Sequence, residues 1–154
     1  MKTRIYVDTS VIGGCLDVEY RIHSRRLLEW FRRGKATAVL SDLTLLELLN
    51  APQAVRAILD DIPDANKETH SMDDEATKLA RAYLAARVLT RRQWLDAQHI
   101  ALAAVRRVDL LVSWNFRHIV NLRRIHGYNS VNLGRGYPIL EIRSPREVVS
   151  DERA

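Results

Sequence analysis

The chain has 154 residues, of which 47% are hydrophobic. That is enough apolar material for one ordinary core but not for two comfortable domains, so we expect residues 1–154 to form a single domain. No apolar run approaches the roughly 20 residues that span a bilayer, and we expect neither a membrane segment nor a signal peptide. The single cysteine, Cys15, excludes zinc sites built from cysteine clusters and fits a reducing cytoplasm.

The net charge of +5 is unevenly distributed along the chain. Residues 60–75 contain seven acids and one lysine, whereas residues 76–135 contain eleven Lys and Arg and only two acids. A basic region of this kind favours a polyanionic partner, with nucleic acid as the obvious candidate. The alternative is that these long side chains only solvate helix surfaces.

Short apolar segments and helical stretches alternate along the chain. The apolar segments lack strict alternation and predict strands at residues 4–8, 36–40, 110–113 and 139–142. Helices are predicted at residues 20–33, 43–49, 53–61, 73–88, 93–107 and 116–126. The motif SPRE at residues 144–147 offers a helix N-cap, a first-turn proline and a capping-box glutamate, whereas residues 64–70 receive no assignment. The pattern predicts an α/β fold in which helices cover both faces of a short, mainly parallel sheet.

Polar side chains follow two of the predicted strands directly. The segment YVDTS brings Asp8 to the end of the first strand, and VDLLVSWN brings Ser113 and Asn115 to the end of a later one. Ligands of open parallel sheets bind beyond the carboxyl ends of the strands. If the two strands are neighbours, these oxygen-bearing groups lie close together where chemistry can occur.

Two further acids occupy unusual positions in predicted helices. Glu47 lies among leucines in LTLLELLNAP, where a carboxylate is partly desolvated and needs a cation or several donors. Asp96 opens the alanine-rich helix of DAQHIALA. Each acid also has an ordinary alternative: a turn former for Asp8, an exposed helix residue for Glu47 and a helix cap for Asp96.

Taken together, the segments YVDTSVI, LTLLELLNAP, DAQHIALA and VDLLVSWNFRHI, in this order and spacing, resemble the PIN-domain ribonuclease family. The likeness is greatest to the VapC-type toxins of type II toxin–antitoxin pairs, and it runs from Arg4 to about Tyr128, with a family-like final strand in YPILEI. The resemblance implies a three-layer α/β/α fold and cleavage of RNA that depends on a divalent metal ion. It also implies a homodimer and a small cognate antitoxin that blocks the pocket, often with a basic side chain.

The resemblance further implies roles for individual residues. Asp8 and Asp96 would bind Mg²⁺ or Mn²⁺, and Glu47 would join them or hold a metal-bound water; hard oxygen ligands suit these ions. Ser10 would be a secondary hydroxyl, and Ser113 would support Asp8. Three acids so close together repel, so without metal at least one should have a raised pKa.

The chain departs from the family pattern at Asn115, where many PIN domains carry a fourth acid. An amide offers an oxygen to a metal-bound water without adding charge, which should weaken binding of any second ion. Asn115 therefore leaves open an alternative function: a catalytically weak or inactive PIN-like module that binds RNA or a protein. A different enzyme class, the aspartyl phosphotransferases, also has an Asp after the first strand, but it requires a second Asp where this chain has Ser10.

Several other residues have both a functional and a structural interpretation. His99 follows Asp96 by one helical turn and can approach the site, although a hydrogen-bonded structural role is the simpler prediction. Arg117 and His118 are candidates for contact with RNA phosphates, or for a solvated helix start. The three tryptophans are too dispersed to form a stacking platform, so packing is expected for them.

Overall fold

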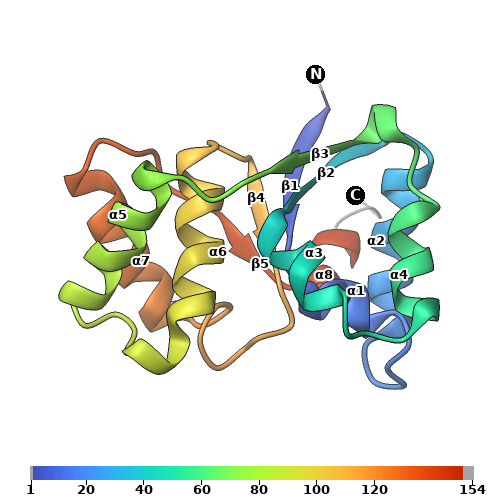
Figure 1. Ribbon diagram of the computed structural model, residues 1–154, viewed down its shortest axis with the longest axis horizontal. Coiled ribbons are helices and arrows are strands. Elements are labelled where there is room, and N and C mark those ends of the chain that lie inside the picture. The colour runs from blue at the N-terminus through green and yellow to red at the C-terminus, as the bar shows by residue number, and fades with distance from the viewer. Residues whose placement is uncertain (1, 151–154) are drawn as a thin grey trace.

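A five-stranded sheet in which all strands are parallel forms the centre of the computed structural model, which describes residues 2–150 (Figure 1). Its spatial order is β3-β2-β1-β4-β5. The strands are β1 (Thr3–Val7), β2 (Ala36–Ser41), β3 (Lys67–His70), β4 (Leu110–Val112) and β5 (Ile142–Arg143). The predicted α/β/α architecture is confirmed, and the sheet is wholly rather than mainly parallel.

Helices cover both faces of this sheet. They are α1 (Thr9–Gly14), α2 (Arg21–Arg32), α3 (Asp42–Leu48), α4 (Gln53–Asp60), α5 (Asp74–Ala85), α6 (Trp94–Val105), α7 (Leu122–Gly134) and α8 (Pro145–Ser150), with short 3₁₀ turns η1 (Asp64–Asn66) and η2 (Arg91–Gln93). In Figure 1, α5, α6 and α7 lie on one side of the sheet, and α1, α2, α4 and α8 lie on the other. No helix of residues 2–150 has the length and apolarity needed to cross a membrane.

The buried parts of the central strands are mostly apolar because their side chains pack into two cores, one on each face of the sheet. In β1, Tyr6 packs into the cluster of α5, α6 and α7, whereas Ile5 and Val7 pack into the opposite cluster. In β4, Leu111 and Val112 divide between the two clusters in the same way. Successive side chains of a strand point to opposite faces, so a strand covered on both faces shows a run of apolar residues rather than an alternation of apolar and polar ones.

The strand predictions hold for three of the four segments. The segment at residues 64–70, which received no assignment from sequence, contains η1 and the edge strand β3. The strand predicted at residues 139–142 is wrong in extent, because only Ile142 and Arg143 pair with β4. The SPRE motif acts as predicted: the Ser144 N–H donates to Glu147 at 3.0 Å, and the Glu147 N–H donates to the Ser144 hydroxyl at 3.3 Å, at the start of α8.

The helix predicted at residues 116–126 is also wrong in position. Residues 116–119 form turns, and α7 begins only at Leu122, where the Asn121 side chain caps the Arg124 N–H at 3.2 Å. The turns are fixed by Asn115, whose backbone carbonyl accepts hydrogen bonds from the N–H groups of Ile119 and Val120. The displaced helix start leaves residues 113–121 as a loop at the carboxyl edge of the sheet.

Candidate active site

The topology brings Asp8 and Ser113 side by side. Strands β1 and β4 are neighbours in register, with Val7 opposite Val112, and each polar residue directly follows one of these strands. Strands β2 and β3 lie on one side of β1, and β4 and β5 lie on the other, so the strand order reverses at β1. Ligand sites of open parallel sheets form at such a switch point.

Asp8 is 6% exposed, and both of its carboxylate oxygens are held. Ser10 donates to Oδ1 and Ser113 donates to Oδ2, each at 2.6 Å. Asp8 is also the N-cap residue of α1, but its side chain makes no cap hydrogen bond, so the turn-former alternative does not account for it. Burial raises the pKa of Asp8 against the opposing effect of the two hydroxyls. Its negative charge is therefore only partly compensated.

The two serines are themselves fixed by the loop after β4. The Ser10 hydroxyl accepts the Trp114 N–H at 2.9 Å, and the Ser113 hydroxyl accepts the Asn115 N–H at 3.0 Å. Each hydroxyl uses an acceptor position for the backbone and so directs its proton toward Asp8. The structure thus places Ser10 and Ser113 against the two carboxylate oxygens of Asp8.

Glu47 projects from α3 and is held by two donors. The Thr9 hydroxyl donates to Oε1 at 2.7 Å, and His99 Nε2 lies 3.0 Å from the same oxygen. Burial alone would raise the pKa of Glu47, but the hydrogen bonds from His99 and Thr9 outweigh it and hold the pKa below its usual range. Glu47 thus remains charged through donors of the protein itself.

His99 connects this acid to the core. It is 3% exposed, and its Nδ1 lies 2.6 Å from the Tyr6 hydroxyl, which lies 2.9 Å from the Ser41 hydroxyl. Because a carboxylate can only accept, His99 Nε2 carries a proton toward Glu47. His99 is hydrogen-bonded and buried, as the structural interpretation predicted, and it also contacts a candidate site residue. No sequence signal pointed to Tyr6 or Thr9 at this site beyond their closeness to Asp8.

Asp96 lies half-buried in the first turn of α6, whose N-cap is Gln93 rather than Asp96. Burial raises the pKa of Asp96, and the charges of Asp8 and Glu47 raise it further, against the opposing charges of His118 and His99. The effects of Asp8 and Glu47 on Asp96 place both acids within electrostatic reach of it. Two of the three acids have raised pKa values; burial is the main cause in both, and repulsion between acids contributes only at Asp96.

Asn115 makes contacts that the sequence did not suggest. Its Nδ2 donates to Asp96 Oδ2 at 3.4 Å, and its Oδ1 accepts the N–H groups of Arg117 at 3.2 Å and His118 at 2.9 Å. The amide oxygen predicted to serve a metal-bound water is therefore engaged by the backbone. In this arrangement Asn115 positions Asp96 and the loop after β4.

The remaining candidates divide between site and packing. The Arg117 side chain is exposed, whereas His118 is half-buried and its Nδ1 has no hydrogen-bond partner within residues 2–150. Trp114 stacks on Tyr20 at a centroid distance of 4.3 Å and donates to Ser24 at 2.8 Å, which agrees with the packing role expected for it. Cys15 is buried.

The acids do not form a ready-made metal cage. Within the described residues, no three His, Cys, Asp or Glu side chains are grouped closely enough to hold a metal ion. Each carboxylate instead has its own donor: Ser113 for Asp8, Thr9 for Glu47 and Asn115 for Asp96. Mg²⁺ typically keeps several waters and takes only one or two carboxylates, and Asp8 and Asp96 are buried or half-buried carboxylates that supply oxygen ligands of this kind. The donor set therefore fits a hydrated divalent ion held by this pair.

Comparison with known proteins agrees with this architecture. The family model described as "PIN domain" matches residues 5–119. Among solved structures, the chain is similar to VapBC2 from Rickettsia felis bound to a DNA fragment from its promoter, with 15% identity, 92% of this chain and 98% of that chain covered, and a TM-score of 0.57. At that identity the likeness establishes the fold alone. No curated protein matches the sequence. Because the family model spans more than half of the chain, this protein belongs to the PIN-domain family.

Proposed function

We propose that this protein is a ribonuclease that cleaves RNA phosphodiester bonds with Mg²⁺ or Mn²⁺ and acts as the toxin of a toxin–antitoxin pair. PIN domains are typically nucleases. The observation that carries the proposal is the environment of Asp8: a buried carboxylate with a raised pKa at the switch point of the sheet, within electrostatic reach of Asp96 and Glu47. A protein that only needed a stable core would gain nothing from this arrangement.

The site residues have different roles in the proposed reaction. Asp8 and Asp96 would hold the ion, and their orientation is set by Ser10 and Ser113 on one side and by Asn115 on the other. A bound divalent ion supplies Lewis-acid activation of a phosphate oxygen and lowers the pKa of an attacking water. Glu47 remains charged and, held by Thr9 and His99, can orient a water molecule as a hydrogen-bond acceptor.

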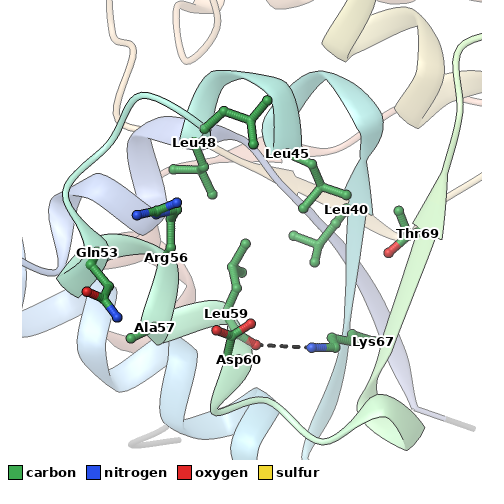
Figure 2. Close-up of a pocket in the computed structure, with 11 residues that line it drawn as sticks. Leu40, Leu45, Leu48, Gln53, Arg56, Ala57, Leu59, Asp60, Lys67 and Thr69 are labelled. Carbon is green, nitrogen blue, oxygen red and sulfur yellow. Dashed lines mark hydrogen bonds between the residues drawn. The ribbon is translucent and has the colours of Figure 1, made fainter.

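A further part of the proposal is a small antitoxin protein as partner. A hollow of about 600 Å³ lies between α3 and α4, and its lining includes Leu40, Leu45, Leu48 and Leu59 (Figure 2). Lys67 lies at one side of it, where its ammonium donates to the Leu59 carbonyl at 3.1 Å. Leu46 and Leu49, the second of which also lines the hollow, are 61% and 64% exposed. Leu46 lies on α3 with Glu47, and Leu49 directly follows that helix, so an apolar segment bound there would lie next to Glu47.

The partner proposal predicts a short reading frame immediately upstream of the gene, and co-expression of the two products tests it. The double variant Leu46→Asp, Leu49→Asp should lose the complex, because it places charge on the apolar surface. Leu122→Asp, at a leucine that is 74% exposed on α7, is the matched control and should retain it. Equal co-purification of both variants would contradict the docking surface. A homodimer also remains a proposal, and sedimentation showing a monomer at micromolar concentration would contradict it.

The activity is tested with purified protein and a long RNA transcript, with either Mg²⁺, Mn²⁺ or EDTA. We expect cleavage that requires the ion and is abolished in Asp8→Asn. Asp61→Asn, which removes an exposed acid outside the site, is the matched control and should cleave normally. Cleavage that persists in Asp8→Asn would contradict the proposal. RNA binding without cleavage under any of these conditions would favour the inactive binding module that Asn115 leaves open.

A further inference from the structure

Two neighbouring hollows beside the site are lined by arginines. The first, of about 550 Å³, includes Arg87, Arg117, Arg123 and Arg124 in its lining, and the second, of about 600 Å³, includes Arg91, Arg92 and Arg124. Arg124 lines both, so the two hollows are neighbours. No acidic side chain lines either one. We refer to these six residues as the arginine surface.

The charges of the arginine surface are not neutralised within the described part of the chain. Other arginines are paired: Arg4 with Glu68 at 2.9 Å and Arg106 with Asp73 at 2.7 Å. In contrast, none of the six makes an ion pair with a carboxylate of residues 2–150, and all except Arg124 are exposed. Like charges gathered without counter-charges create a positive potential that attracts a polyanion.

One member of the set gives the surface a fixed frame. Arg124 is half-buried, and its Nη1 donates to the Val88 carbonyl in the turn between α5 and η2. In that turn Arg87 has a positive φ of 61°, which ends α5 and turns the chain toward α7. The hydrogen bond ties this turn to the start of α7, so the arginines of both segments face the same space.

The arginine surface adjoins the acids on two sides. Arg117 follows Asn115 by two residues, and its N–H donates to the Asn115 amide oxygen. Arg92 precedes Asp96 by four residues and lies in η2, which continues directly into α6. Figure 1 shows the start of α6 and the loop before α7 at the same end of the molecule. These links place the arginine surface on the segments that lead directly to Asn115 and Asp96.

We propose that the arginine surface binds the phosphodiester backbone of the RNA strand, next to the phosphate that is cut. The assignment to RNA rests on the proposed function, whereas the binding of a phosphodiester backbone follows from the surface itself. Arginine forks bind phosphate oxygens in pairs and carry no sequence information, so this surface holds the strand without selecting its bases.

The test measures binding separately from cleavage. A fluorescein-labelled single-stranded RNA of twelve nucleotides and a DNA of the same sequence are titrated in EDTA, by fluorescence anisotropy, at several salt concentrations. The variants are Arg87→Gln with Arg123→Gln in the first hollow, and Arg91→Gln with Arg92→Gln in the second. Arg21→Gln with Arg146→Gln removes the same charge from exposed arginines on α2 and α8 and is the matched control.

For each variant of the arginine surface we expect RNA affinity to fall on the order of tenfold near 0.1 M salt, and the slope of log affinity against log salt to fall by about 0.7 for each phosphate that the variant no longer binds. The control should match the native protein, and RNA should bind at least as tightly as DNA. Unchanged affinity and slope would overturn the inference even if the native protein cleaves RNA. A strong preference for DNA would overturn the assignment to RNA. Loss of affinity in a protein that never cleaves would uphold the surface and refute the proposed function.

Discussion

Replacing Asp8 with asparagine should stabilise the protein when no divalent ion is present. Burial raises the pKa of Asp8 although Ser10 and Ser113 both donate to it, so the charged carboxylate is a net cost to the folded state. A carboxyl whose pKa is higher in the folded than in the unfolded chain makes stability fall as pH rises from about 4 toward the folded-state pKa. Asp8→Asn removes this cost, so its advantage exists at neutral pH and disappears below about pH 4.

The size of the effect follows from opposing contributions. Each hydroxyl bond to the charged group stabilises it by about 1.5–3 kcal/mol, and burial outweighs these bonds, so a net cost is left. Single stabilising substitutions commonly add about 0.5–2 kcal/mol, and we expect Asp8→Asn to fall in this range. In a domain of this length, that corresponds to a rise in Tm of about 1–8 °C. An ion at 100 times its Kd stabilises the native protein by about 2.7 kcal/mol, and it should not stabilise Asp8→Asn to the same extent.

Thermal melts at pH 7.5 and pH 4, in EDTA and in Mn²⁺, measure both effects. The native protein should melt higher in Mn²⁺, whereas Asp8→Asn should melt higher than the native protein in EDTA at pH 7.5 and gain little from the ion. Asp61→Asn should behave as the native protein does. A lower Tm for Asp8→Asn in EDTA at pH 7.5, or an undiminished Mn²⁺ shift, would refute the reasoning.

Three further changes follow from contacts of the site. His99→Leu should reduce kcat by about 10–100-fold with little change in KM, with partial recovery in His99→Gln, because His99 holds Glu47; a change confined to KM would contradict this. Ser113→Ala should cost about 1–3 kcal/mol in urea unfolding at neutral pH, because buried Asp8 loses a donor; an unchanged midpoint would contradict it. Asn115→Asp should strengthen Mn²⁺ binding in calorimetry, because it adds a charge beside Asp96, whereas indistinguishable titrations would place position 115 outside the ion's influence.

The strands whose side chains are buried on both faces of the sheet could be predicted from sequence, whereas the more exposed edge strand could not. Strands β1, β2 and β4 are apolar because helices cover both faces, and each was predicted. The edge strand β3 has the sequence KETH, which carries no apolar pattern, and it pairs on one side only. The start of α7 was misplaced because Asn115 holds the preceding residues in turns through its own carbonyl and amide oxygens.

The candidate site shows the same division between local and long-range information. The position of Asp8 after a buried strand is a local signal, and so are those of Glu47 and Asp96 on their helices. The link from Tyr6 through His99 to Glu47 joins residues up to 93 positions apart, and no local pattern encodes it. In the sequence, Tyr6 has the pattern of an ordinary strand residue, and its ring does pack in the core. Only its hydroxyl group contacts His99.

The proposed chemistry requires both the three acids and the arginine surface, because neither group suffices by itself. A phosphodiester carries negative charge and is repelled by Asp8, Glu47 and Asp96 at the edge of the sheet. A divalent ion removes that repulsion over a few ångströms but does not position a strand. The arginine surface attracts the strand over a Debye length of about 8–10 Å, yet its guanidinium groups remain charged at neutral pH and cannot act as a base. Removing the ion should therefore abolish cleavage while preserving binding, and removing the arginines should weaken binding while sparing the chemical step at saturating RNA.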